Sequence, residues 1–281
     1  MIDGPASHAV ALPAPPLRVY ISHYAGVCAE GLAPVTHAGL PSRHAHLIIS
    51  FGEPIELLRS PDGGQQPGCF RALVSGLHDS PALVRMNSRV HLVHVFLTPL
   101  GVRAILGVSN SALTSRVVEL SDVWARRASH LVERLWSGAS WGARFAELDE
   151  AFSRALQPAV VPAAVVWAWR QLATTSGGRP ISALAREIGW SRSHFTDRFI
   201  AAFGVGPKTA ARIFRFERAC RALKTDPRRV ADVAYSSGYY DQAHMTREWQ
   251  ALAGCSPRQW IARELPFLQD YELSFREDEH R

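Results

Sequence analysis

Short apolar segments separated by Gly- and Pro-rich turns make up the N-terminal third of the chain. Alternating apolar and polar side chains predict β-strands, since successive side chains of a strand point to opposite faces. The segments with this pattern are residues 17–24, 46–52, 55–58, 72–77, 82–86 and 89–97. Several short strands with turns between them predict a small antiparallel barrel or sandwich. Residues 1–16, rich in Ala and Pro, predict a flexible arm before it.

After residue 98 the apolar period changes from that of a strand to that of a helix. Pro99 suits the first turn of a helix, and residues 117–124 are extended before they turn into one. The predicted helices are residues 99–106, 128–136, 141–156 and 163–174. An apolar stripe follows one side of the third helix, and it either packs within the domain or forms a dimer face. Its members are Phe145, Leu148, Phe152 and Leu156.

A flexible linker is predicted between these helices and the C-terminal part. Residues 158–162 interrupt the helical pattern with two prolines, and residues 174–180 read TTSGGRP. Small and polar residues of this kind favour a hinge. The predicted linker therefore covers residues 158–180 and includes one helix.

The C-terminal part contains the same pattern twice. A short apolar helix, a glycine and a second helix occupy residues 181–203, and the arrangement returns at residues 230–252 with one extra residue in the turn. Gly189 and Gly238 allow the positive φ that a sharp turn between helices needs. The order helix, glycine turn, helix predicts two helix-turn-helix units, which place their second helices in the major groove of DNA.

Each second helix should present one row of side chains to solvent. We expect Phe195 and Phe199, and Met245 and Trp249, to point into the core, because they lie one turn apart. Steps of about 100° per residue then leave a polar row on the opposite side. The rows are Ser193, Thr196, Asp197 and Ile200 in the first copy, and Ala243, Thr246, Arg247 and Gln250 in the second. Arg198 and Glu248 fit flanking surface charges.

An amphipathic helix is predicted between the two copies, over residues 207–223. At about 1.5 Å per residue it spans about 25 Å, which is close to the one-turn spacing of successive major grooves. Lys208, Arg212 and Arg215 on this helix are either phosphate contacts or a solvated basic face.

The distribution of charge supports a polyanionic partner for the repeated part. Residues 177–262 hold 14 Lys and Arg against 7 Asp and Glu, whereas residues 1–176 hold 14 against 12. A basic segment that coincides with two helix-turn-helix units is what DNA binding requires. No stretch resembles a membrane span or a secretory leader, so a cytoplasmic protein is expected.

The repeated motifs resemble the paired helix-turn-helix domain of the AraC/XylS family of bacterial transcription regulators. The resemblance is carried by LAREIGWSRSHFTDRFIAAFG at residues 184–204 and GYYDQAHMTREWQALAGCSP at residues 238–257. It implies a helical DNA-binding domain over residues 181–265, with two recognition helices that enter successive major grooves. Double-stranded operator DNA and RNA polymerase are the implied partners, and no enzymatic activity or cofactor is implied.

The resemblance also implies roles for individual residues. The implied base contacts are Ser193, Thr196, Asp197, Gln242, Ala243, His244 and Arg247, and the phosphate contacts are Arg192, Lys208, Arg212, Arg215 and Gln250. Arg247 is expected to read guanine, the commonest specific contact of arginine. Many members of the family carry an arginine where this chain has Asp197, and an aspartate accepts instead from the amino group of cytosine.

The order of segments is that of AraC-type regulators as a whole, which implies an α+β chain. Residues 17–157 would form a cupin-like antiparallel β-barrel with following helices, which binds a small effector or forms a homodimer. An acidic tail, residues 266–281, would follow the DNA-binding domain. Ligand pockets are mostly apolar with a few polar groups, and the candidate lining is His46, Phe51, His94 and Phe96.

Two alternatives remain at this point, a cupin-type metal enzyme and a ligand-free dimeric regulator. His44 and His46, followed by Glu53, faintly resemble a cupin metal motif. The second histidine motif of cupins is missing, and His91 and His94 should fall on opposite faces of a strand. No nucleophile triad or phosphate-binding loop is present. The four cysteines are far apart and form no CxxC, which argues against a zinc ribbon or a disulfide framework.

Overall fold

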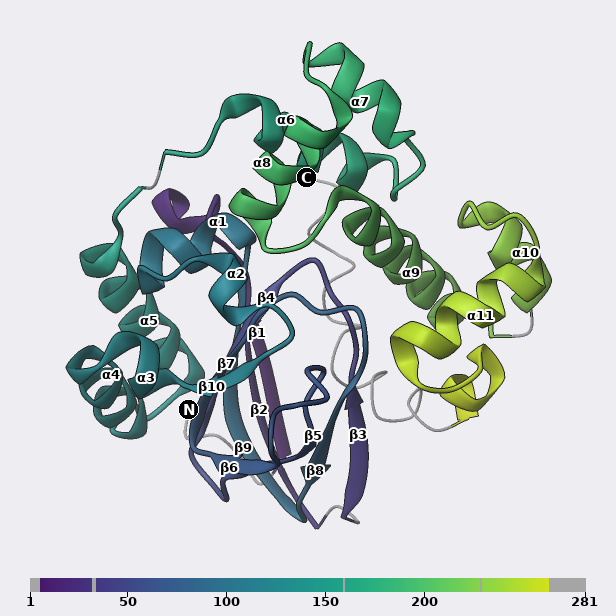
Figure 1. Cartoon of the computed structure of the whole chain (residues 1–281). Coiled ribbons are helices and arrows are strands. Elements are labelled where there is room, and N and C mark those ends of the chain that lie inside the picture. Colours follow the sequence, from purple (N-terminus) through teal and green to yellow (C-terminus); the bar gives the residue numbers. More distant parts are fainter. Residues whose placement is uncertain (1–5, 32–33, 159, 228, 263–281) are drawn as a thin grey trace.

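Two antiparallel β-sheets form the N-terminal part of the protein (Figure 1). The computed structural model describes residues 6–31, 34–158, 160–227 and 229–262. The six-stranded sheet has the order β1 (Ala6–Ala11), β2 (Ile21–Glu30), β9 (Arg89–Leu97), β4 (Ala45–Ser50), β7 (Ala72–Ser75) and β10 (Val117–Glu119). The four-stranded sheet has the order β3 (Val35–Gly39), β8 (Ala82–Met86), β5 (Ile55–Arg59) and β6 (Gly68–Phe70). With the helices that follow, this confirms the predicted α+β class.

Alternation along the strands divides the six-stranded sheet between two interiors. Leu47 and Ile49 of β4 belong to a core on the helix-covered face, whereas Ile48 packs with residues of the four-stranded sheet. Leu57 and Ala82 come from that second sheet and complete the smaller cluster. The two sheets therefore pack face to face.

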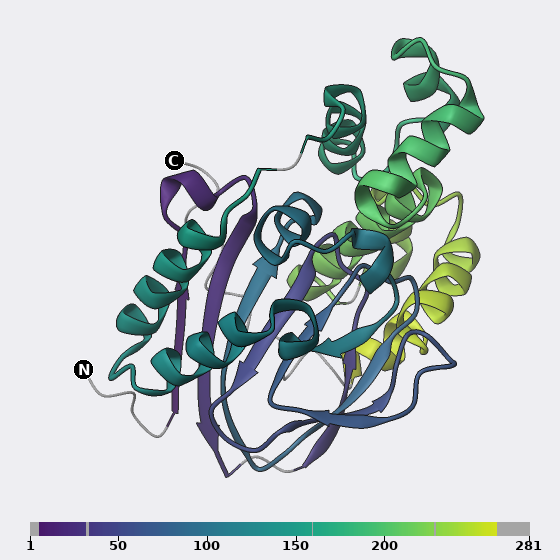
Figure 2. The same ribbon diagram turned by 60° about the vertical axis from the view of Figure 1, so that its left-hand side comes forward.

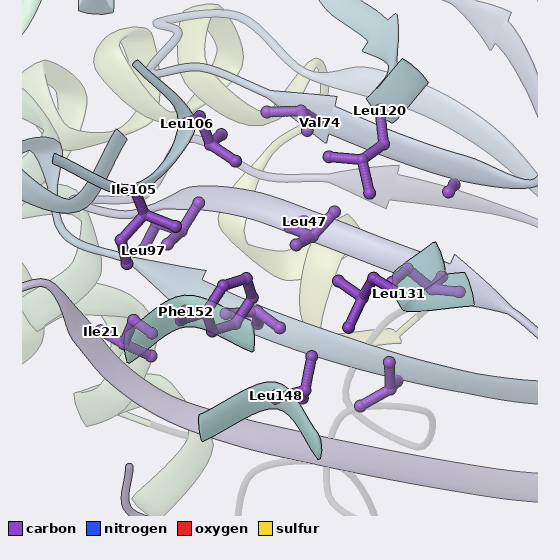
Figure 3. Close-up of a cluster of buried hydrophobic side chains, with 14 of the residues drawn as sticks. Ile21, Leu47, Val74, Leu97, Ile105, Leu106, Leu120, Leu131, Leu148 and Phe152 are labelled. Atoms are coloured by element: carbon purple, nitrogen blue, oxygen red, sulfur yellow. The ribbon is translucent and has the colours of Figure 1, made fainter. Parts of the chain in front are cut away.

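Helices cover the outer face of the six-stranded sheet (Figure 2). They are α3 (Leu120–Trp124), α4 (Arg126–Trp136) and α5 (Trp141–Ala155), and three short segments precede them: α1 (Pro99–Gly101), the π-helical turn η2 (Val102–Leu106) and α2 (Asn110–Leu113). Figure 3 shows Leu148 and Phe152 of α5 in the same cluster of buried side chains as Leu47 of the sheet. Phe145, Leu148 and Phe152 are all buried there, so the stripe on α5 packs within the domain and is not a dimer face.

Residues 257–262 form a further helical segment of the described C-terminal part, and six helices precede it. They are α6 (Ala163–Thr174), α7 (Ile181–Glu187), α8 (Arg192–Phe203), α9 (Pro207–Thr225), α10 (Val230–Ser236) and α11 (Gln242–Ala253). Figure 1 shows α9 running from the α7–α8 unit to the α10–α11 unit. One hydrophobic core lies at each end of α9: Ala210 and Phe214 belong to the first, and Phe216 and Leu223 to the second.

The predicted flexible arm is wrong for its described part. Residues 6–11 form β1, which pairs with β2 in continuous register from Ala6 and Ala29 to Ala11 and Tyr24. The segment reads ASHAVA and has no regular alternation, so its pairing with β2 and not a local pattern makes it a strand. The predicted acidic tail, residues 266–281, lies outside the described residues.

The predicted linker is not a free connection. Val165, Ala168 and Leu172 of α6 are buried in the core of the first helix-turn-helix unit. After α6, Arg179 donates to Gln171 at 2.9 Å and forms an ion pair with Glu187 of α7. The segment therefore joins the first unit, because its apolar helix face has a core to enter.

Gly26 on β2 marks a close approach between the sheet and α5. A Cβ atom at this position would lie 2.3 Å from the ring of Trp141. Overpacking of this kind costs about 1–3 kcal/mol. We expect Gly26→Ala to lower the free energy of unfolding by about 2 kcal/mol, measured by urea denaturation.

The matched control is Gly63→Ala, because a Cβ atom at Gly63 would meet nothing within 4 Å. Surface changes of this kind stay within about 0.5 kcal/mol. Equal effects of the two substitutions would contradict the close contact between Gly26 and Trp141.

Candidate nucleic-acid interface

The two helix-turn-helix units are built with the same local devices. Gly189 and Gly238 take φ values of +74° and +83° at the turns. Ser191 caps α8 by accepting from the His194 N–H at 3.2 Å, and Asp241 caps α11 by accepting from the His244 N–H at 2.6 Å. Left-handed glycines end both helices, Gly204 at +79° and Gly254 at +72°. The duplication seen in the sequence is therefore a duplication of structure.

The first recognition helix, α8, presents the predicted row on its outer side. Ser193 and Asp197 are exposed, and Ile200 is 38% exposed. Thr196 is half-buried, and its hydroxyl donates to the Arg192 carbonyl at 2.9 Å. Phe195 and Phe199 on the opposite side are fully buried. The row contains no cation, so its chemistry is that of hydroxyls and one carboxylate.

The second recognition helix, α11, presents a more extensive row. Gln242, Ala243, Arg247 and Gln250 are all exposed. Their helix is anchored by Met245 and Trp249, which are fully buried in the second core. Within the described part of the chain, Arg247 forms no ion pair, so its guanidinium is available for a partner.

His244 differs from the other predicted base contacts of α11. Its Nδ1 accepts from the Tyr240 N–H at 3.3 Å, and its Nε2 lies 3.8 Å from Oε1 of Glu248. The ring also packs edge-on against Tyr239, with 5.5 Å between centroids. Both ring nitrogens therefore face protein groups, and a base contact by His244 would require one of them to be released.

Arg212 and Arg215 of α9 do not form an open basic face. Both are half-buried and pair with Glu248 of α11, at 3.2 Å from Arg212 Nε and 3.5 Å from Arg215 Nη1. Arg215 also lies over the ring of Tyr239. The structure thus gives these two arginines a structural partner where phosphate contacts were predicted. Periodicity did not reveal this, because it cannot show which neighbouring helix supplies a carboxylate.

Arg192, Lys208 and Gln250, the other predicted phosphate contacts, are exposed. Arg192 begins α8 and Lys208 lies in the first turn of α9, so both cations belong to the first unit. Glu248, expected as a flanking surface charge, is largely buried, with a side chain 15% exposed. The exposed tyrosines Tyr235 and Tyr240 flank the turn of the second unit and were not singled out from the sequence.

The N-terminal part touches both helix-turn-helix units. Leu77, which follows β7, is buried in the first core, and Leu40, which follows β3, packs against the second. In the loop before β4, the backbone N–H of Arg43 donates to Glu217 of α9 at 2.8 Å, and its side chain pairs with the same carboxylate at 2.5 Å. These contacts position the two units relative to the sheets.

A second set of polar contacts holds the end of α8. From α2, the Asn110 side chain donates to the Ala202 carbonyl at 2.8 Å, and the Thr114 hydroxyl donates to the Gly204 carbonyl at 3.0 Å. These carbonyls lack partners within their own helix, since the last turn of any helix leaves them free.

Family comparisons support this geometry. A family described as a helix-turn-helix domain matches residues 184–263, which include both recognition helices. The C-terminal domain is an AraC-type helix-turn-helix domain. A second family, described as a domain of unknown function (DUF6597), matches residues 9–119.

Solved structures share the overall fold of the chain. ToxT from Vibrio cholerae O395 is similar with a TM-score of 0.51 and 9% identity, over 92% of this chain and 98% of ToxT. A second crystal form of Vibrio cholerae ToxT gives a TM-score of 0.50 over the same shares. At this identity the likeness shows a common fold.

A curated relative matches part of the chain. An uncharacterized HTH-type transcriptional regulator of Staphylococcus aureus is 26% identical over 100 residues, which are 36% of this chain. The match spans only 13% of the length of that relative. In the described part of this chain, no helix has the length and apolar character needed to cross a lipid bilayer.

Four histidines surround Phe96 between the two sheets of the N-terminal part. His23 of β2 and His94 of β9 stack on the Phe96 ring, with centroid distances of 3.9 and 4.0 Å. His44 and His46 meet it edge-on at 6.0 and 5.4 Å. Nδ1 of His46 and Nε2 of His94 are 2.8 Å apart, so one ring donates a hydrogen bond and the other accepts it. We call these five residues the histidine cluster.

The histidine cluster contains three of the four residues predicted to line an effector pocket. Phe51 is the exception: it lies on the other face of the sheet, against His91 and Trp136. Strand alternation continues to Phe51, which joins Leu47 and Ile49 in the core on the helix-covered face, opposite to His46.

Glu53 is not brought together with His44 and His46, the residues that faintly resemble a cupin metal motif. Glu53 is exposed, whereas His44 and His46 lie in the histidine cluster. Among the described residues, no three histidine, cysteine or acidic side chains are arranged to hold a metal ion. His91 packs against Trp141 and His94 against Phe96, on opposite faces of β9 as expected.

Burial makes the histidine cluster neutral. It lowers the pKa of His23 to about 4 and that of His46 to about 3. Burial also lowers the pKa values of His44 and His94 well below the usual 6.5, and the neighbouring histidines lower them further. A charged imidazole is disfavoured in a closed apolar site.

This neutrality predicts a loss of stability in acid. Because each folded-state pKa lies below the unfolded value of 6.5, the unfolded chain binds more protons between the two values. Stability from the cluster is therefore complete above pH 6.5 and is lost as the pH falls towards 4 and 3. We expect the titration of His46 alone to lower the free energy of unfolding by roughly 3 kcal/mol between pH 7 and pH 4. Denaturant unfolding at a series of pH values measures this change.

His46→Gln should flatten this dependence, since an amide does not titrate. The control is His130→Gln, because His130 is exposed on α4. A wild-type free energy of unfolding that is constant from pH 7 to pH 4 would contradict the buried, neutral cluster.

Proposed function

We propose that this protein is a sequence-specific DNA-binding transcription regulator, in which α8 and α11 read successive major grooves of one operator. The observation that carries the proposal is the pair of helix-turn-helix units with exposed polar rows, joined by one continuous helix. We infer the activity of the whole chain from that of its AraC-type domain.

The length of α9 supports simultaneous reading by both units. Its 19 residues span about 28 Å at 1.5 Å per residue, close to the roughly 34 Å of one DNA turn. Because its two ends are buried in different cores, α9 fixes the separation of the units. A rigid separation suits two grooves on the same side of a duplex.

The chemistry of the rows supports different roles for the two helices. On α11, Arg247 suits a bidentate contact to guanine and Gln242 one to adenine. On α8, Asp197 suits the amino group of cytosine, and Ser193 and Thr196 suit any base. The row on α8 therefore adds discrimination with little attraction, whereas the row on α11 contains one cation, Arg247.

The N-terminal part is proposed as the regulatory part. It contacts the two units through Leu77 and Leu40, and Arg43 binds Glu217 of α9. A change in the sheets would therefore alter the position of the recognition helices. A small-molecule effector, a second copy of the chain and RNA polymerase are the proposed partners of this regulation. Since the stripe on α5 is buried, a homodimer would use another surface.

Arg247→Ala tests base reading by α11. Loss of a bidentate contact costs about 1–3 kcal/mol at one base pair, so discrimination there should fall roughly 5- to 150-fold. The measurement is a binding titration on a duplex selected from a random library, with each base pair substituted in turn.

Gln250→Ala serves as the control for this change, because Gln250 is exposed on the same helix and is proposed to contact only phosphate. If Arg247→Ala lowers the binding affinity equally for all base substitutions, Arg247 does not read a base.

Lys208→Ala tests phosphate contact by α9. Removing one phosphate contact should weaken all duplexes alike and reduce the slope of log affinity against log salt by about 0.9. Affinity measured from 50 to 200 mM salt gives this slope. Lys208→Arg keeps the charge and should keep the slope; an unchanged slope in Lys208→Ala would exclude the contact.

A further inference from the structure

Glu248 connects the second recognition helix to α9. Its carboxylate receives Arg212 Nε at 3.2 Å on Oε1 and Arg215 Nη1 at 3.5 Å on Oε2. All three side chains are less than a quarter exposed, at 15%, 24% and 18%. Charged groups with so little water around them depend strongly on their partners, because an unpaired one is costly.

The same carboxylate reaches the first turn of α11. Oε1 of Glu248 lies 3.8 Å from Nε2 of His244, one turn towards the N-terminus. Nδ1 of His244 accepts from the Tyr240 N–H, just before the helix begins. Gln242 and Ala243, two proposed base contacts, belong to this turn. The position of Glu248 therefore affects how they are presented.

Arg212 has a further partner in the N-terminal part. Its Nη1 lies 3.5 Å from Oδ2 of Asp79, between β7 and β8. The residues around Asp79 are well held: Leu77 is buried in the first core, and His78 Nδ1 bonds the Ser80 carbonyl at 2.7 Å. Ser80 in turn donates to the Pro61 carbonyl at 3.0 Å. Asp79 is thus attached to the sheets.

We propose that Glu248 is a positioning residue for DNA reading, and that the series Asp79, Arg212, Glu248, His244 links the N-terminal part to the first turn of α11. This inference rests on the proposed function. Arg212 is shared between two carboxylates, one on each part of the chain. When Asp79 moves away, Arg212 pairs with Glu248 alone, and the balance of contacts on Glu248 and His244 changes.

The first helix-turn-helix unit lacks this link. Arg198 occupies the place of Glu248 in the first copy, one residue before the buried aromatic, and it is exposed. The N-terminal part holds α8 through its final carbonyls, far from its reading turn. The link therefore acts on one of the two readers, and its loss should leave recognition by α8 unchanged.

The experiment measures base discrimination by the full-length chain. Wild type first selects a duplex from a random double-stranded library; Gln242→Ala then identifies the base pairs read by the first turn of α11, and Asp197→Asn those read by α8. Glu248→Gln and Asp79→Asn should each change discrimination 3- to 10-fold at the Gln242 base pairs only. The double variant should show the same base discrimination as Glu248→Gln alone, because both substitutions interrupt the same series of contacts.

Asp232→Asn is the matched control. Asp232 of α10 forms an exposed ion pair with Arg229, which precedes that helix, in the same unit but outside the series. Its removal should leave discrimination at every base pair unchanged. Glu248→Asp, which keeps the charge, should restore part of the discrimination lost in Glu248→Gln.

Two outcomes would overturn the inference. If Glu248 only attaches α11 to α9, Glu248→Gln will weaken all duplexes equally and Asp79→Asn will have no effect. If the effects of the two substitutions add, Asp79 and Glu248 act separately. A wild-type chain that selects no duplex would instead refute the proposed function, so the two failures are distinguishable.

Discussion

The sharing of α9 between two hydrophobic cores is the constraint on which the DNA-binding part depends. Phe214 enters the core of the first unit and Phe216, two residues later, enters that of the second. Residues two apart on a helix point in different directions, so the two units must lie on different sides of α9. The relative placement of α8 and α11 therefore follows from the apolar pattern of a single helix.

The basic side chains of α9 also contribute to the arrangement of the helices. The basic side chains of α9 are divided between solvent, where Lys208 is exposed, and the carboxylate of Glu248, which takes Arg212 and Arg215. A basic segment in a sequence thus has two uses, attraction of DNA and attachment of neighbouring helices. Only the structure separates them, because the partner carboxylate is distant in sequence.

Much of the fold could be predicted because local signals agreed with the final packing. Residues 82–86, 89–97 and 163–174 have the predicted bounds, since their apolar periods match the faces they bury. The short strands β3 and β6 were missed, because they have few apolar residues and lie at sheet edges. The exposed rows of α8 and α11 could be predicted from helix geometry. The histidine cluster could not, because it depends on the register between strands that are distant in sequence.

The seating of Leu77 and Leu40 in the two helical cores has a consequence for how such chains can be rebuilt. Leu77 is buried in the first helical core and Leu40 packs against the second, so each part of the protein completes the packing of the other. A chimera that exchanged the sheets would need leucines, or residues of similar size, at both positions to keep water out of these contacts.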